Sequence, residues 1–99
     1  MDYIGKKVIV RCNRAGVFFG KLSEYDSNTR EARLKNVRRI HYWDGAASLT
    51  QMAAEGVKNP RNCRFTQAIP DMTVMEVIEL IPCSEDSIIN MEDVPVWKV

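Results

Sequence analysis

The sequence is poor in the residue types on which most metal and redox sites depend. Its 99 residues contain one histidine, His41, and three widely separated cysteines. No Cys-x-x-Cys pair occurs, so neither a disulfide framework nor a structural zinc site is indicated. We expect Cys12, Cys63 and Cys83 to be reduced, partly buried thiols.

Long apolar runs and phosphate-binding glycine motifs are also missing. No stretch approaches the roughly 18 apolar residues of a membrane-spanning helix, and the N-terminus lacks the apolar segment of a signal peptide. The five glycines form neither a Gly-x-Gly-x-x-Gly motif nor a phosphate loop. We expect a soluble, cytoplasmic protein with one domain over residues 1–99, because this length allows one core.

His41 is the obvious candidate for a general base, but no carboxylate or nucleophile stands at a diagnostic spacing from it. A catalytic histidine needs a partner that orients its ring. We therefore expect no enzymatic activity, no metal and no cofactor.

Charge is divided unevenly along the chain. The segment to Arg64 holds 13 of the 14 Lys and Arg residues with six acids, and the remainder holds seven acids and only Lys98. Three interpretations stay open. The halves pair within one fold, the basic half binds an anion, or subunits associate head to tail.

The first half predicts three strands. Lys6 to Cys12, Val17 to Tyr25 and Glu31 to Trp43 are rich in β-formers, with turn residues at 13–16 and 26–29. Apolar residues of the third segment change parity around Asn36, so we expect a bulge or sharp bend there.

The second half predicts a helix followed by shorter elements. Ser48 to Gln51 matches a capping box, in which Gln51 bonds the N–H of Ser48, and Gly56 can end that helix. Cys63 to Ile69 and Val74 to Ile81 predict strands separated by Pro70 and Asp71. Ser84 can cap a short helical turn. Val94 to Trp97 predicts an edge strand that either joins another subunit or folds back on its own core.

These elements predict an α+β fold. We expect a small, bent antiparallel sheet or a partly open barrel of the SH3 or Sm type, with one inserted helix and a short C-terminal helical turn. The first half resembles the Sm-like pattern through a short set of apolar and glycine positions. They are Val8, Val10, Gly16, Val17, Gly20, Leu22, Tyr25, Asp26, Leu34 and Val37.

A second resemblance covers most of the chain. Residues 38–53, Gly56-Val57, Pro60, Cys63, 79–82 and 94–98 resemble a family of small uncharacterised proteins of tailed bacteriophages and prophages. This resemblance implies a phage setting and an infected bacterial host. Because small non-enzymatic phage proteins often antagonise host defence, it also implies such a role.

The segment from Arg38 to Gln51 is the strongest candidate for a ligand site. Arginine can hold a phosphate with two N–H bonds, and aromatic rings can stack on bases. Strand alternation would place Arg39, His41 and Trp43 on one face and Arg38 and Tyr42 on the other. Helix N–H groups after Ser48 would add donors, although the capping box competes for them. The predicted ligand-binding residues are Arg38, Arg39, His41, Tyr42, Trp43, Ser48, Gln51, Arg61 and Arg64.

The alternative is structural, with the aromatic rings in the core or a subunit contact and the arginines solvated. The leading functional hypothesis is a non-enzymatic protein that binds a small nucleotide, such as a cyclic or ADP-ribose-type immune signal, and acts as a sponge. An Sm-like oligonucleotide-binding module is the second hypothesis, and a direct protein inhibitor of a host defence enzyme is the third. A homo-oligomer is expected, and RNA or a host protein remains a possible partner.

Overall fold

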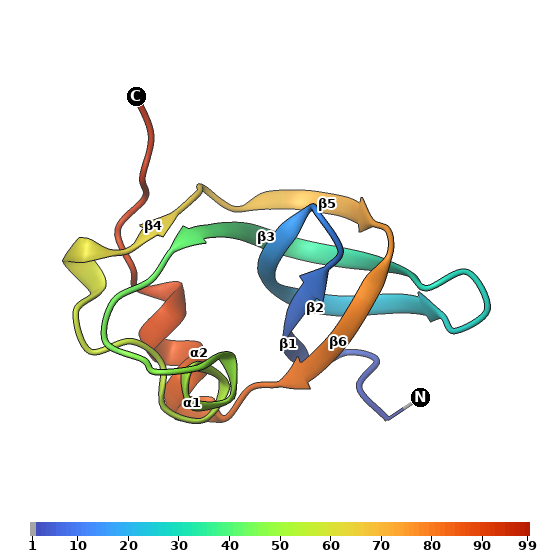
Figure 1. Cartoon of the computed structure of the whole chain (residues 1–99), viewed down its shortest axis with the longest axis horizontal. Helices are drawn as coiled ribbons and strands as arrows, with labels where there is room; N and C mark the ends of the chain where they lie inside the picture. The colour runs from blue at the N-terminus through green and yellow to red at the C-terminus, as the bar shows by residue number, and fades with distance from the viewer. Residues whose placement is uncertain (1) are drawn as a thin grey trace.

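A strongly bent antiparallel sheet is the framework of the computed structural model, which describes residues 2–99 (Figure 1). Its strands are β1 (Lys7–Cys12), β2 (Gly16–Asp26), β3 (Glu31–Tyr42), β4 (Arg64–Phe65), β5 (Ile69–Val74) and β6 (Val77–Pro82). Neighbouring strands follow the order β4-β3-β2-β1-β6, and β5 also pairs with β3. The helices are α1 (Leu49–Glu55), the 3-10 helix η1 (Pro60–Asn62) and α2 (Glu85–Glu92). The predicted bent α+β fold is thus confirmed.

The first three strands form two hairpins where the turn residues indicate them. The carboxylate of Asp26 accepts hydrogen bonds from the N–H groups of Asn28 and Thr29, at 2.9 and 3.4 Å, and so closes the second turn. In Figure 1 this hairpin end lies far from the two helices.

A bulge interrupts β3 at the predicted place. Asn36 has a φ of 49°, and the pairing of β3 with β2 shifts by one residue between Lys35 and Arg38. At this irregularity β3 lies close to β2: a β-carbon added to Gly20 would lie 3.0 Å from the Cβ of Val37. Leu34 and Val37 therefore face the same side, and Ile40 faces the other.

The sheet carries a core on each face. The core inside the bend is built mainly from β1, β2 and β3, with Phe18, Leu22 and Leu34 fully buried. The second core lies under the helices and contains Phe19 and Phe65. Because both faces are covered, side chains from alternate positions of β1 to β3 are buried on opposite sides.

Two serines, one just before α2 and one within it, join α2 to α1, which lies beside it (Figure 1). Ser84 caps α2 by accepting from the N–H of Ser87, and its hydroxyl donates to the carbonyl of Ala54 at 2.6 Å. The buried Ser87 hydroxyl donates to the carbonyl of Met52 at 2.7 Å. The carbonyl of Ala54 at the end of α1 gains a donor in this way, and that of Met52, which also accepts from the N–H of Gly56, gains a second one.

The second half differs from prediction in three places. The strand expected over 63–69 is interrupted: β4 covers two residues, residues 66–68 are irregular, and Ile69 is the first residue of β5. The break expected at Pro70 and Asp71 is wrong, since both lie inside β5, where proline is tolerated because β5 pairs on one side with β3. The break falls instead at residues 75–76, so the strand expected over 74–81 is divided between the end of β5 and β6. The edge strand expected over 94–97 is only a single bridge between Val96 and Phe65.

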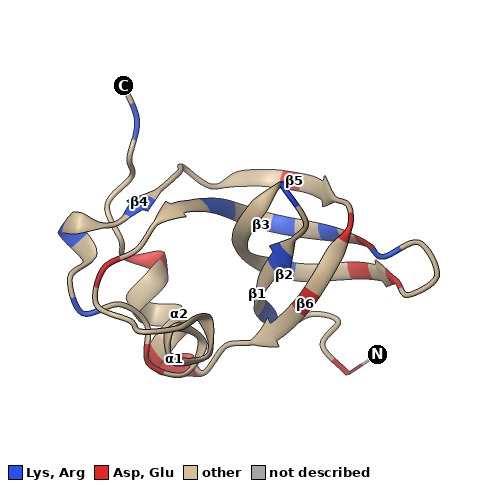
Figure 2. Ribbon diagram, viewed as in Figure 1, with Lys and Arg blue, Asp and Glu red and all other residues tan. Residues whose placement is uncertain are grey.

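Ion pairs connect the basic and acidic halves of the chain. The four found among residues 2–99 are Lys7–Glu92, Arg11–Glu79, Arg33–Asp71 and Lys35–Asp71. Each joins a base before residue 36 to an acid after residue 70, so the halves pair within one fold. Figure 2 shows bases along β3 and around η1 and β4, with acids on both helices. No helix among the described residues is long and apolar enough to cross a membrane.

Candidate nucleic-acid interface

Arg38 is a structural residue. Its side chain is 5% exposed and faces the helices. The guanidinium donates to the carbonyls of Thr66 and Met91 at 2.7 and 2.9 Å, and to those of Phe65 and Pro95 at 3.4 Å. Burial lowers the pKa of Arg38. This Arg38 clamp uses the donors that a ligand would need, so Arg38 does not face a ligand here.

The helix start is also used structurally. Ser48 accepts from the N–H of Gln51 at 3.1 Å, as the capping box predicts. The Gln51 side chain accepts instead from the N–H of Ala47 at 2.7 Å, one residue before the expected donor. Trp43 packs against the core under the helices, and its indole N–H donates to the carbonyl of Ala46. Trp43 thus leaves the face expected to contain Arg39 and His41, because β3 ends at Tyr42.

Four planar side chains gather at the end of β3. The guanidinium of Arg64 lies 5.5 Å from the ring centre of Trp97 and 6.0 Å from that of Tyr42. The ring of His41 lies 5.2 Å from that of Trp97, tilted by 57°. Tyr42 and Trp97 are about half exposed, at 50% and 47%. We call His41, Trp97, Arg64 and Tyr42 the aromatic–arginine row.

The Arg38 clamp holds Trp97 in this row. The clamp binds the carbonyl of Pro95, and the N–H of Trp97 donates to the carbonyl of Phe65 at 2.8 Å. Phe65 pairs with Ile40, and Arg64 pairs with Tyr42. Residues far apart in the sequence therefore meet at one end of the sheet.

The loop at 58–62 is fixed beside the strand end. The Asp44 carboxylate accepts from the side-chain amides of Asn59 and Asn62, at 3.1 and 3.0 Å. These hydrogen bonds lower the pKa of Asp44. Gly45, with a φ of 98°, allows the close contact, because a β-carbon there would clash with the backbone nitrogen of Lys58. The loop thus presents Arg61, which is exposed, from a fixed support.

Arg39 faces the opposite side of β3 from Arg38. Its guanidinium lies 4.9 Å from the ring centre of Phe18. Its Nε is the one buried side-chain nitrogen or oxygen without a hydrogen-bond partner among residues 2–99. A hollow of about 200 Å³ lies here, which we call the Arg39 hollow. Its lining residues are Val37, Arg39, His41, Thr66, Gln67, Ile69 and Met72.

Positive charge is unpaired around the row. The ion pairs of the described chain use only bases up to Lys35, so Arg39, Arg61 and Arg64 have no carboxylate within 4 Å. Cations without carboxylate partners beside exposed rings favour a polyanion whose aromatic bases are unpaired and free to stack.

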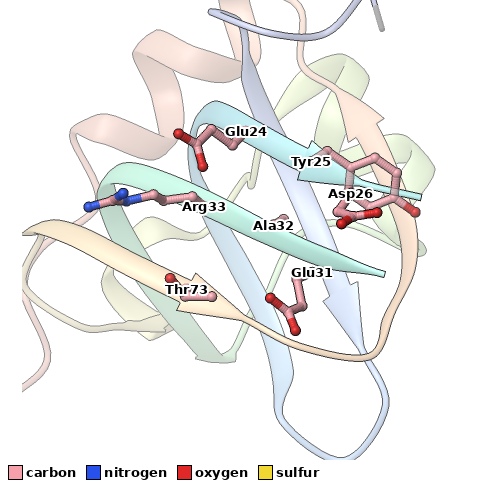
Figure 3. A pocket seen from close by; sticks show the side chains of 7 residues that line it. All are labelled: Glu24, Tyr25, Asp26, Glu31, Ala32, Arg33 and Thr73. Carbon is pink, nitrogen blue, oxygen red and sulfur yellow. The ribbon is translucent and has the colours of Figure 1, made fainter. Parts of the chain in front are cut away.

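The opposite end of β3 has the opposite character. A hollow of about 330 Å³ there is lined by Glu24, Asp26 and Glu31 together with Arg33 (Figure 3). Arg33 is already bound to Asp71 through two hydrogen bonds, at 3.0 and 2.7 Å. The surplus of carboxylates would repel phosphate, so this hollow does not suit a nucleic acid.

The cysteines do not contribute to the row. All three are free, with Cys12 and Cys63 buried. Burial raises the pKa of each thiol, that of Cys83 to about 11, so the reactive thiolate form is disfavoured. The part of the chain that is described holds no group of three metal-ligating side chains.

The structure brings together five of the nine residues predicted from the sequence: Arg39, His41, Tyr42, Arg61 and Arg64 lie at or beside one end of the sheet. Trp97 and Thr66 were missed as site residues. The one feature of the sequence that could have indicated Trp97 was its position in an apolar C-terminal segment with no obvious partner. That segment folds back on its own chain, as one of the two interpretations allowed, but leaves the indole about half exposed.

Comparison with known proteins places the chain in a family. Residues 5–91 match the model of a domain of unknown function, DUF6948, and the chain belongs to that family. This agrees with the resemblance to a family of uncharacterised proteins. The fold is similar to that of a heptameric archaeal Sm protein, with a TM-score of 0.53 and 20% identity over 84% of this chain and 93% of that one. No curated protein matches the chain significantly.

Proposed function

Starting from an Sm-like fold in a family without an assigned activity, we propose that this protein is a non-catalytic module that binds single-stranded nucleic acid. The observation that carries the proposal is the aromatic–arginine row. Arg64 lies over two exposed rings, and His41 extends the row beyond Trp97. Exposed planar groups suit the stacking of unpaired bases, while the unpaired cations nearby suit the phosphates.

The small volume of the Arg39 hollow favours an oligonucleotide over a small nucleotide as the ligand. Small-ligand sites are usually concave and enclose about 300–1,000 Å³. The Arg39 hollow, of about 200 Å³, is too small to enclose a cyclic dinucleotide or ADP-ribose. An extended strand needs no such enclosure, because each stacked base contributes roughly 1–3 kcal/mol independently.

The decisive experiment measures fluorescence anisotropy with labelled single-stranded RNA and DNA of increasing length, at two salt concentrations. Affinity should rise with strand length and fall with salt. Trp97→Ala and Arg64→Met should each weaken binding by at least about fivefold, because each removes a stacking or charged contact. Ile89→Ala is the matched control, because Ile89 is exposed on α2, outside the row. Equal binding by wild type and both row variants would overturn the proposal.

Capture of a small nucleotide is the second candidate, favoured by the partnerless Nε of Arg39 beside His41. In a phage setting, such capture would hide an immune signal from the host. Thermal unfolding with linear and cyclic nucleotides and ADP-ribose isomers separates the two candidates. A ligand at about 100 times its Kd adds roughly 2.7 kcal/mol of stability. Stabilisation by one nucleotide, without any dependence on strand length, would favour capture. A protein that binds neither would point to direct inhibition of a host protein.

We further propose a homo-oligomer that forms through the outer sheet edges. Strands β5 and β6 each pair on one side with another strand of the described chain. Ile78 on β6 and Met75 beside it are 49% and 60% exposed, which is typical of an edge that has a partner. The similar Sm protein is a heptamer. Native mass spectrometry should find oligomers that Ile78→Lys dissociates, and a monomer at all concentrations would contradict this part of the proposal.

A further inference from the structure

The Arg39 hollow lies next to the aromatic–arginine row, because His41 belongs to both. Its ring is the end of the row beyond Trp97, and its side chain lines the hollow. If a strand stacks along the row, as the proposed function requires, one further base lies within reach of the hollow.

The walls of the hollow suit a base better than a phosphate. Val37, Ile69 and Met72 provide apolar surface, whereas a phosphate would need several hydrogen-bond donors. A nucleobase has two apolar faces and a polar edge. A volume of about 200 Å³ is below that of a drug-sized site, which limits the occupant to a single group of this size.

Arg39 is the charged residue of the hollow and can supply donors to that edge. It forms no ion pair among residues 2–99, and its Nε is buried without a partner. Its backbone N–H is held by the hydroxyl oxygen of Thr66 at 2.8 Å, and its guanidinium is supported by the ring of Phe18. The cation is thus held in place but not neutralised.

We propose that the Arg39 hollow selects guanine. On the edge that carries N7, guanine alone among the standard bases presents two adjacent acceptors, N7 and O6, and arginine pairs with both. Adenine and cytosine present an amino donor at the corresponding position, which the guanidinium would repel. Arg39 is therefore the residue that determines specificity within the proposed nucleic-acid site.

The test compares labelled hexauridine with the same strand containing one guanine, one inosine or one 7-deazaguanine. Inosine keeps both acceptors, and 7-deazaguanine lacks N7. Wild type should bind the guanine and inosine strands at least about fivefold more tightly than hexauridine, as a bidentate contact implies. Most of this preference should be lost with 7-deazaguanine.

Arg39→Met should abolish the guanine preference, and Arg39→Lys should weaken it, because lysine can still donate to N7 and O6 but without the guanidinium fork. Both variants should bind hexauridine as tightly as Lys21→Met does. Lys21 is exposed on β2 and does not line the hollow, so this variant controls for the loss of one positive charge. Thermal unfolding checks that the variants are folded, and the modified bases test the same contact without changing the protein. Equal binding of all strands by wild type, or a preference that survives in Arg39→Met, would overturn the guanine site alone. Failure to bind any strand would overturn the proposed function with it.

Discussion

At the scale of single residues, two adjacent arginines have opposite roles. Arg38 is buried and donates to four carbonyls, whereas Arg39, on the other face of β3, forms no ion pair within residues 2–99. The bulge at Asn36 sets which arginine faces which side. Of these two adjacent arginines, Arg38 therefore stabilises the fold, whereas Arg39 is available to the candidate site.

Arg38→Met should lower the free energy of unfolding by at least about 2 kcal/mol, because the carbonyls of Thr66 and Pro95 lose the donors that Arg38 supplies and those of Phe65 and Met91 each lose one of their donors. Arg38→Lys should be intermediate, since one ammonium cannot reach carbonyls in the directions of the guanidinium fork. Urea denaturation measures both. Arg61→Met is the control, because Arg61 is exposed and its loss should change stability by less than about 0.5 kcal/mol. Equal stabilities for the Arg38 and Arg61 variants would show that the clamp contributes little.

The sequence allowed the role of a residue to be predicted where its hydrogen-bond partners lie close to it along the chain. The turn at Asp26 and the capping residue Ser48 bond to groups within three residues, so their roles follow from local chemistry. The role of Arg38 depends on carbonyls at residues 65, 66, 91 and 95, which no local pattern identifies. Trp97 was missed for the same reason, because its position depends on a bridge to Phe65.

At the scale of elements, the loop at 58–62 depends on one glycine. Gly45 and Gly16 both have positive φ values, 98° and 103°, but only a β-carbon at Gly45 would meet backbone atoms of the loop. Substituting Gly16 therefore measures the energetic cost of the backbone conformation alone, whereas substituting Gly45 measures that cost together with the steric clash.

Gly45→Ala should destabilise the protein more than Gly16→Ala does. Each substitution incurs backbone strain of about 1–3 kcal/mol, and only the first must also displace the loop. Thermal unfolding gives the stabilities. Hydrogen exchange should show faster exchange over residues 58–62 in the Gly45 variant alone. Indistinguishable variants would mean that the loop adjusts to the added carbon at no cost.

For whole helices and strands, too, the predictions were confirmed where local residues determine the structure and wrong where distant residues do. β1 to β3 and α1 were confirmed because turn and cap residues mark their ends. The break at Pro70 was wrong because proline marks a break only where its missing N–H is needed, and β5 pairs with β3 alone. Which strand becomes an edge is decided by the whole sheet, so this residue could not be interpreted locally.

At the scale of the whole molecule, ion pairs tie the acidic half of the chain to the basic half. Asp71 bonds Arg33 and also lies 3.4 Å from Lys35. The hydrogen bond from Arg33 lowers the pKa of Asp71 from 3.8 to about 2. A carboxyl with a lowered folded-state pKa stabilises the fold above its ordinary pKa, and this contribution is lost as it becomes protonated.

Asp71→Asn should therefore reduce stability at neutral pH, and its difference from wild type should disappear as pH falls from 3.8 towards 2. Denaturation at a series of pH values measures the difference. Asp2→Asn provides the comparison, because Asp2 forms no ion pair among the described residues. A difference that stays constant down to pH 2 would rule out the ion pair as its origin.

The separation of charge along the chain also makes the protein suitable for division into two fragments. A cut in the exposed loop near Arg61 would leave a cationic fragment with β1, β2 and β3 and an anionic fragment with β5 and β6. Strand β5 pairs with β3, and β6 pairs with β1, so neither fragment could complete the sheet alone. Opposite net charges would speed their association at low salt. The ion pairs that stabilise the intact molecule would thus form between the two fragments and help them to associate specifically.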